Sequence, residues 1–267
     1  MMDAAAHLDL SVEEALRSVA ATPTLLVALD FDGTLSLLQD EPMQARMLPE
    51  ARTALDELIA LPDTVVALVS GRSLSDLEII SEHTDESAIL LAGSHGAEFW
   101  YPESGAVEPD ELDSEHALRD RLRAASEAEL GELDGIWVEP KTFGFGIHTR
   151  MASADDAERA WQFADALVAQ NAPHWRRRTG HNIVEYSFRQ EGKDTAIAVL
   201  REHVGATAVV FAGDDVTDED AMAKLGPDDL GIRVGDGRTA AAVRVGSAKE
   251  LAAALSVLAA MRASAQE

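Results

Sequence analysis

The chain has 267 residues, of which 46% are hydrophobic, and this suits a folded protein with one large domain or a core plus a smaller domain. The formal net charge of −26 argues against nucleic acid or an anionic membrane as a partner, because both need a basic surface. The absence of cysteine excludes disulfides and thiolate sites, and no apolar run approaches the ~18 residues of a membrane span, so we expect a cytoplasmic protein, acting as a monomer.

The first part of the chain alternates predicted helices and strands. Residues 11–20 predict a short helix, with Ser11 as its N-cap and Glu14 completing a capping box. Short apolar runs that are hydrophobic throughout are typical of parallel strands covered by helices on both faces. The predicted strands lie at about 24–30, 64–70 and 88–93, and the helices between them at 48–60 and 73–83.

The pattern changes after Pro102 and changes back at Lys193. Between them a helix followed by two strands occurs twice, which is typical of a small antiparallel sheet with helices on one face. These elements lie at 113–130, 136–141, 144–150, 154–170, 174–179 and 182–188, and later ones at 208–212, 231–234 and 248–262. We therefore expect an α/β fold with a discontinuous parallel-sheet core, residues 1–103 and 190–267, and an inserted α+β cap domain, residues 104–189.

Polar segments follow three of the apolar runs. The segments are 30–34, 70–72 and 213–218, and Lys193 begins the returning part of the core. In an open α/β sheet, ligands bind beyond the carboxyl ends of the strands, so these segments are expected to meet in one crevice. The crevice would combine carboxylates, a hydroxyl and an ammonium, which together are typical of a phosphoryl-transfer site.

Each residue type in this set has a chemical use. Asp30 can attack phosphorus as a carboxylate, and Asp32 can protonate the leaving oxygen and then activate water. Gly33 allows a sharp turn close to the phosphate, while Ser70 and Lys193 can hold its oxygens.

A phosphate dianion beside Asp30, Asp214 and Asp218 would meet repulsions of about 4 kcal/mol per close charge pair. Mg²⁺ prefers a few carboxylates together with phosphate and water oxygens, so it would remove this barrier. The sequence therefore predicts a magnesium site among these aspartates.

Strand parity gives the predicted cap a charged sheet face. The apolar residues Ile136, Val138, Phe143, Phe145 and Ile147 are expected to pack on the helices. The opposite, charged face of the sheet could simply be solvated. Its place in a domain inserted beside a crevice favours the alternative, that this face closes over the site. Its polar residues are Glu139, Lys141, His148, Arg150 and Glu185.

These residues resemble the haloacid dehalogenase-like phosphatases and, more closely, the trehalose-6-phosphate phosphatase family, from Leu25 to Leu258. Segment 30–35 is similar to the nucleophile motif, 70–72 to the phosphate-binding motif, Lys193 to the third motif and 213–220 to the fourth. Asp194 stands where the family usually has glycine. The resemblance implies a haloacid dehalogenase-like Rossmannoid core with an αββαββ cap, and a phosphatase acting on trehalose 6-phosphate with Mg²⁺ as cofactor. It also implies a functional link to a trehalose-phosphate synthase.

The resemblance also implies residue roles. Asp30 would be nucleophile and Mg²⁺ ligand, and Asp32 general acid/base and a ligand through its carbonyl. Asp214 would bind the metal directly and Asp218 would act in or near its coordination shell. Substrate contacts would come from Gly33, Thr34, Gly71, Arg72 and His95 in the core, and from Glu139, Lys141, His148, Arg150 and Glu185 in the cap.

Other functions remain open at this point. Sucrose, mannosylglycerate and glucosylglycerol phosphates are alternative substrates for a similar core and cap. A nonspecific sugar phosphatase is a further alternative function. A catalytically silent sugar-phosphate sensor, or the regulatory half of a synthase complex, is the alternative from another class. The intact carboxylates argue against it, because they would repel an anionic ligand. A phosphomutase would use the same two aspartates, but the large polar cap fits one bulky substrate better.

Overall fold

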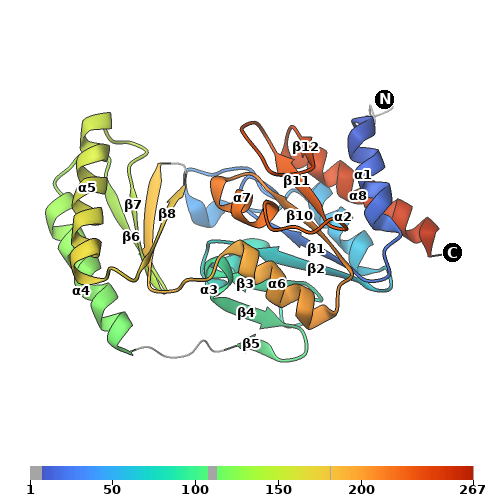
Figure 1. The fold of residues 1–267 in the computed structure, drawn as a ribbon, viewed down its shortest axis with the longest axis horizontal. Coiled ribbons are helices and arrows are strands. Elements are labelled where there is room, and N and C mark those ends of the chain that lie inside the picture. The colour runs from blue at the N-terminus through green and yellow to red at the C-terminus, as the bar shows by residue number, and fades with distance from the viewer. Residues whose placement is uncertain (1–7, 108–112, 181, 267) are drawn as a thin grey trace. The chain divides into compact units, whose positions relative to one another are not determined.

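The protein is described by a computed structural model covering residues 8–107, 113–180 and 182–266 (Figure 1). The chain divides into two compact units, Met1–Glu108 with Glu191–Glu267, and Pro109–Gln190. The first contains a mostly parallel sheet and the second a separate antiparallel sheet, so the expected mixed α/β class is confirmed. The functional division into a catalytic core and a specificity cap stays a prediction. Within the described ranges, no helix is both long and apolar enough to cross a membrane.

The sheet of the first unit is parallel except at one edge. Pairing is parallel from β12 to β3, and the last two strands are antiparallel additions. The sequence pattern did not predict the three short strands β4, β5 and β12, because none is an extended apolar run. In spatial order the strands are β12 (Val243–Val245), β11 (Leu230–Val234), β10 (Ala208–Gly213), β1 (Leu25–Leu29), β2 (Thr64–Val69), β3 (Leu90–Gly93), β4 (Glu98–Tyr101) and β5 (Gly105–Val107).

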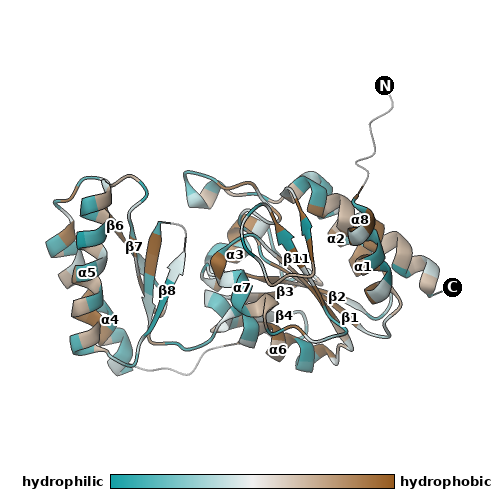
Figure 2. Cartoon of the chain, turned by 45° about the horizontal axis from the view of Figure 1, so that its top comes forward, coloured by the Kyte–Doolittle hydropathy of each residue, from teal (hydrophilic) through white to brown (hydrophobic). Residues whose placement is uncertain are grey.

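Helices cover both faces of this sheet, which explains why its central strands are hydrophobic throughout (Figure 2). Leu25, Val27 and Leu29 share one core cluster with α1 (Leu10–Ala20), α2 (Pro49–Ile59), α3 (Leu74–Ser81) and α8 (Ala248–Ala265). Leu26 and Ala28 belong to a second cluster with α6 (Lys193–Val204) and α7 (Val216–Met222). Two single-turn helices, η1 (Pro42–Gln44) and η2 (Ser94–Gly96), lie in the loops after β1 and β3.

The second unit is a four-stranded antiparallel sheet with two helices. Its strands, in the spatial order β6, β7, β9, β8, are Trp137–Lys141, Gly144–His148, Ile183–Ser187 and Arg176–Gly180. Phe145 and Ile147 are buried on one sheet face, as the parity argument expected, and their register partners Tyr186 and Val184 are buried with them. The helices, α4 (Asp113–Leu130) and α5 (Ala154–Asn171), pack on this sheet at β6 and β7.

Two local expectations were wrong. The helix begins at Leu10 and its N-cap is Asp9, whose carboxylate accepts the Ser11 N–H at 2.8 Å. Ser11 therefore lies inside the first turn, where its N–H needs an acceptor of its own. The strand expected at 144–150 ends at His148, so Arg150 lies in the following turn and strand parity does not place it on the charged face.

Candidate active site

The sheet topology brings distant segments together at one point. β1 lies between β10 and β2. From β1 the chain continues to β2 and β3 on one side, and from β10 it continues to β11 and β12 on the other side. Such a switch point leaves a crevice beyond the carboxyl ends of the two strands. Asp30 directly follows β1 and Asp214 directly follows β10, so both carboxylates lie at this boundary.

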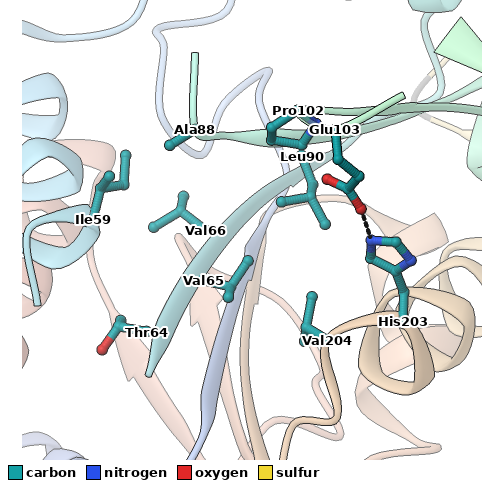
Figure 3. A pocket seen from close by; sticks show the side chains of 10 residues that line it. All are labelled: Ile59, Thr64, Val65, Val66, Ala88, Leu90, Pro102, Glu103, His203 and Val204. Atoms are coloured by element: carbon teal, nitrogen blue, oxygen red, sulfur yellow. Dashed lines mark ion pairs between the residues drawn. The ribbon is translucent and has the colours of Figure 1, made fainter. Parts of the chain in front are cut away.

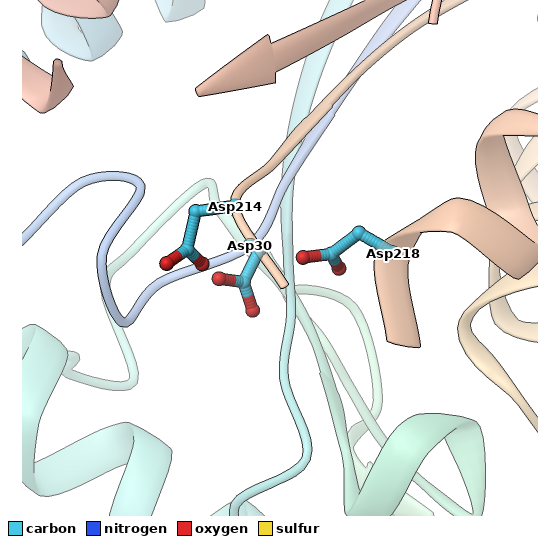
Figure 4. A group of neighbouring side chains, drawn as sticks. All are labelled: Asp30, Asp214 and Asp218. Carbon is cyan, nitrogen blue, oxygen red and sulfur yellow. The ribbon is translucent and has the colours of Figure 1, made fainter. Parts of the chain in front are cut away.

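Three aspartates form a cluster there, two of them buried and Asp214 half-buried (Figure 4). Carboxylate oxygens of Asp30, Asp214 and Asp218 all lie within 4.8 Å of one another. Lys193, at the start of α6, donates from Nζ to Asp30 Oδ1 at 2.5 Å and to Asp218 Oδ1 at 2.6 Å. The Lys193 and Asp218 side chains are almost entirely buried. Among these described groups, one ammonium therefore faces three carboxylates.

This excess of negative charge is visible in the pKa values. Burial raises the pKa of Asp30 well above its usual value, with Asp218 and Asp214 adding to the rise and Lys193 opposing it. Burial, followed by the charge of Asp218, raises the pKa of Asp214 to about 7. Burial alone would lower the pKa of Lys193, but Asp218 and Asp30 raise it above its ordinary value. Three oxygen donors with uncompensated charge fit a hard divalent cation such as Mg²⁺.

Two glycines let the carboxylates approach the backbone. Gly33 has φ +75°, and a Cβ there would lie 2.1 Å from Oδ2 of Asp214. A Cβ on Gly213 would lie 2.3 Å from the carboxyl carbon of Asp218. Thr34 Oγ1 donates to Asp30 Oδ2 at 3.1 Å, and lies 3.5 Å from an Asp214 oxygen. Any side chain at either glycine would therefore disturb the acidic cluster.

The predicted phosphate-binding segment adjoins His95, another core residue from which substrate contacts are expected. Ser70, almost fully buried, follows β2, and its carbonyl accepts the His95 N–H at 2.9 Å. A Cβ on Gly71 would lie 2.7 Å from the His95 ring, so the ring lies against this glycine. His95 has φ +59°, an uncommon conformation for a residue with a side chain. Ser70, Gly71 and His95 thus form one packed group.

Asp32 has a different partner from Asp30. Arg72 donates to it from Nε at 2.6 Å and from Nη2 at 2.7 Å, a bidentate ion pair. Arg72 Nη2 also donates to the Pro42 carbonyl at 2.8 Å. The sequence carries both residues in its motifs, but no local pattern predicts that they pair, because they are separated by 40 positions.

In the second unit, four predicted residues form a compact network, here called the charged face: Glu139, Lys141, His148 and Glu185. Lys141 Nζ lies 2.9 Å from Glu139 and 3.2 Å from Glu185, and His148 Nε2 lies 2.8 Å from Glu139. Burial alone would raise the pKa of Glu139, but its bond with His148 and the charge of Lys141 bring it below its usual value. Burial alone would lower the pKa of Lys141, yet Glu185 and Glu139 raise it.

The sequence analysis missed two residues that belong beside the charged face. Trp137 stacks on His148, with ring centroids 4.3 Å apart and ring planes 4° apart, and keeps 44% of its surface exposed. Arg178 is the register partner of Glu185 across β8 and β9. The same parity argument could have found Trp137, since it lies two positions before Glu139 on one strand.

A pocket of about 340 Å³ lies elsewhere in the first unit (Figure 3). Thr64, Val65 and Val66, at the amino end of β2, line it, whereas Asp30 and Ser70 follow the carboxyl ends of their strands. Its polar rim is the ion pair of His203 and Glu103, at 2.7 Å. The described lining includes none of the predicted site residues, so this pocket is separate from the predicted site.

Comparisons with known proteins identify the family and the fold. Trehalose-phosphate phosphatase of Mycobacterium bovis is 34% identical over 228 residues, which is 80% of this chain and 56% of that protein. The chain thus spans about half the length of the curated relatives it matches. The solved C-terminal domain of C. albicans trehalose-6-phosphate phosphatase superposes with a TM-score of 0.79 at 18% identity, covering 94% of this chain and 98% of that one.

Solved structures outside the trehalose-6-phosphate phosphatases share this fold. A haloacid dehalogenase-like hydrolase from B. subtilis superposes with a TM-score of 0.60 at 16% identity, covering 86% of this chain and 98% of that one. Both superpositions show the haloacid dehalogenase-like fold. Residues 28–256 match the sequence profile described as trehalose-phosphatase, and this range contains the acidic cluster and the charged face. The chain belongs to the trehalose-phosphatase family.

Proposed function

We propose that this chain is a Mg²⁺-dependent phosphatase that hydrolyses trehalose 6-phosphate to trehalose and phosphate through an aspartyl-phosphate on Asp30. The acidic cluster carries the proposal, because Asp30 combines a buried carboxylate, a bond to Lys193 and two neighbouring carboxylates. Family membership, and the name of the mycobacterial relative, support the substrate.

Asp30 supplies the nucleophile in this proposal. Its Oδ1 is held by Lys193 and its Oδ2 by Thr34, so the carboxylate has a fixed orientation. Attack of one oxygen on phosphorus forms the acyl-phosphate bond as the bond to the sugar oxygen breaks. Asp32 donates a proton to that oxygen and then takes one from the water that hydrolyses the intermediate. Ser70, Gly71 and Lys193 hold the phosphate oxygens.

Asp30, Asp214 and Asp218 would hold the metal, with Asp32 contributing through its carbonyl. When bound, Mg²⁺ neutralises the excess carboxylate charge and offsets the repulsion between Asp30 and the phosphate dianion. The role of the chain is to keep the ligands together: glycines at 33 and 213 admit two of the carboxylates, and Lys193 ties Asp218 to Asp30.

The charged face supplies the sugar contacts in this proposal. Sugar hydroxyls need both donors and acceptors, and Lys141 with Glu139 and Glu185 offers both within one ion-pair network. His148, and Arg150 in the turn after β7, would complete this set, and His95 would serve in the core.

Phosphate release from a substrate panel tests the proposal. The panel contains trehalose 6-phosphate, sucrose, mannosylglycerate and glucosylglycerol phosphates, and p-nitrophenyl phosphate, each with Mg²⁺ and with EDTA. We expect the highest kcat/KM for trehalose 6-phosphate and loss of turnover with EDTA that added Mg²⁺ restores. A higher value for another sugar phosphate would reassign the substrate, and full turnover in EDTA would overturn the metal. No turnover of any ester, with tight binding of one, would indicate a sensor.

Single-turnover labelling tests the covalent step. In H₂¹⁸O, hydrolysis of an aspartyl-phosphate by attack of water on phosphorus puts the label into phosphate, so the isotope alone does not settle the route. Rapid quench of ³²P-labelled substrate is therefore the measurement. We expect transient label on the peptide that contains Asp30. Complete turnover without protein-bound label at any time would indicate direct attack of water.

A further inference from the structure

Arg72 stands in the motif from which phosphate contacts are expected, yet its guanidinium is directed to other groups. Nε and Nη2 donate to the two oxygens of Asp32 at 2.6 and 2.7 Å. Nη2 also donates to the Pro42 carbonyl at 2.8 Å, and Nη1 lies 3.8 Å from the Met43 sulfur. A guanidinium has five N–H donors, and these contacts use Nε–H, both hydrogens of Nη2 and one of Nη1.

The pair is also well placed to fix a side chain. Only 15% of the Arg72 side chain and 29% of the Asp32 side chain are exposed. A bidentate arginine–carboxylate pair defines both the plane and the position of the carboxylate, which a single hydrogen bond does not. The bond to Pro42 anchors the same guanidinium to η1, so Arg72 is itself held in place.

We propose that Arg72 is a positioning residue for Asp32 and does not bind the transferring phosphate. This rests on the proposed function, in which Asp32 protonates the leaving oxygen. A sugar alkoxide is a strong base and must be protonated as its bond to phosphorus breaks, whereas p-nitrophenolate leaves without a proton. Removing Arg72 should therefore slow hydrolysis more for esters with strongly basic leaving groups than for esters with weakly basic ones.

Aryl phosphates of graded leaving-group basicity test this without any trehalose. With Arg72→Ala, we expect kcat/KM for phenyl phosphate, which reports the step that releases the leaving group, to fall ~10- to 100-fold, and the loss for p-nitrophenyl phosphate to be about tenfold smaller. The loss is less than the ~10²- to 10⁴-fold of complete general acid catalysis because Asp32 itself remains. Arg72→Lys should resemble Arg72→Ala, because an ammonium cannot form the bidentate pair. Adding Arg72→Ala to Asp32→Asn should cause little further loss, since the two residues act as one unit.

Arg46 offers a matched control. It donates to the Met43 and Ala45 carbonyls at 2.9 and 2.7 Å and so contacts the same loop without touching Asp32. Arg46→Ala should leave the dependence on the leaving group unchanged. If it steepens that dependence as Arg72→Ala does, the effect comes from the loop and the proposal is wrong.

A binding measurement separates positioning from phosphate contact even if turnover is lost. Calorimetric titration with inorganic phosphate should give Kd values for Arg72→Ala within about twofold of the native chain, while Ser70→Ala weakens binding. Equal losses on both aryl phosphates, a Kd raised tenfold or rescue by Arg72→Lys would assign Arg72 to the phosphate. An unchanged kcat/KM on both esters would also overturn the proposal. Activity on aryl phosphates but not on trehalose 6-phosphate would reject the proposed substrate alone.

Discussion

The acidic cluster and the charged face use the same residue types with opposite electrostatic results. In the cluster, three carboxylates share one lysine, and burial with mutual repulsion raises the pKa of Asp214 to about 7. On the charged face, Glu139 is held by both Lys141 and His148, and its pKa is lowered. Burial raises the pKa of both carboxylates, so the surrounding charges decide whether the net shift is upward or downward. An unbalanced cluster suits metal and phosphate chemistry, whereas a balanced network suits hydrogen bonds to a neutral sugar.

The largest expected effect lies in the cluster. Asp30→Asn should lower kcat by more than ~10³-fold on trehalose 6-phosphate and on p-nitrophenyl phosphate alike, because it removes the nucleophile while preserving the shape of the side chain. Steady-state kinetics with both esters measures this, and circular dichroism checks the fold. Asp76→Asn, in the first turn of α3, is the control and should have little effect. If Asp30→Asn retained a tenth of the native rate, Asp30 would not be the nucleophile.

The charged face should affect only the sugar substrate. Glu139→Ala or Glu185→Ala should lower kcat/KM for trehalose 6-phosphate ~10- to 100-fold, because each change removes one of the two carboxylates paired with Lys141 and leaves a sugar hydroxyl without a partner. Hydrolysis of p-nitrophenyl phosphate should change little. Glu158→Ala, on the exposed surface of α5, is the matched control. Equal losses on both esters would mean that these residues support folding or catalysis and not sugar binding. The two regions would then not differ in role.

The imbalance of charge in the cluster should appear as a pH-dependent stability. Because the pKa of Asp214 is raised in the folded chain, its contribution to stability is full below about pH 4 and is lost as the pH rises through about 7. In EDTA, Asp214→Asn should therefore raise Tm at pH 8 by several degrees, given ~2–4 °C per kcal/mol, and should change it little at pH 4. Thermal unfolding followed by circular dichroism measures both. Destabilisation at pH 8 in EDTA would contradict the assignment of unbalanced charge.

The smallest expected effect belongs to Trp137. Its stacked ring offers an apolar surface beside the charged face, so Trp137→Ala should raise KM for trehalose 6-phosphate ~2- to 10-fold, the range of an aromatic contact. Trp137→Phe should retain most of the affinity. Quenching of Trp137 fluorescence by trehalose, absent in Trp137→Phe, gives a readout independent of turnover. An unchanged KM in the alanine variant would limit the sugar contacts to the charged groups.

Local patterns in the sequence determined which elements form and where the chemistry lies. Apolar runs such as 25–29 predict strands because both faces are covered, and a polar residue directly after such a run, as at Asp30, must lie at the carboxyl edge of the sheet. Alternation along β6 likewise placed Glu139 and Lys141 on one face before any contact was known.

Tertiary structure decided the partners, because contacts between distant residues leave no local pattern. The pairing of Arg72 with Asp32, the place of Lys193 between Asp30 and Asp218, and the stacking of Trp137 on His148 all join separate strands or loops. The short strands β5 and β12 lie at the two edges of the sheet and β4 joins β5 to β3, so all three form by adding to strands that the rest of the chain supplies. Where a strand stops is decided in the same way: β7 ends at His148, and Arg150 leaves the charged face that parity alone assigned to it.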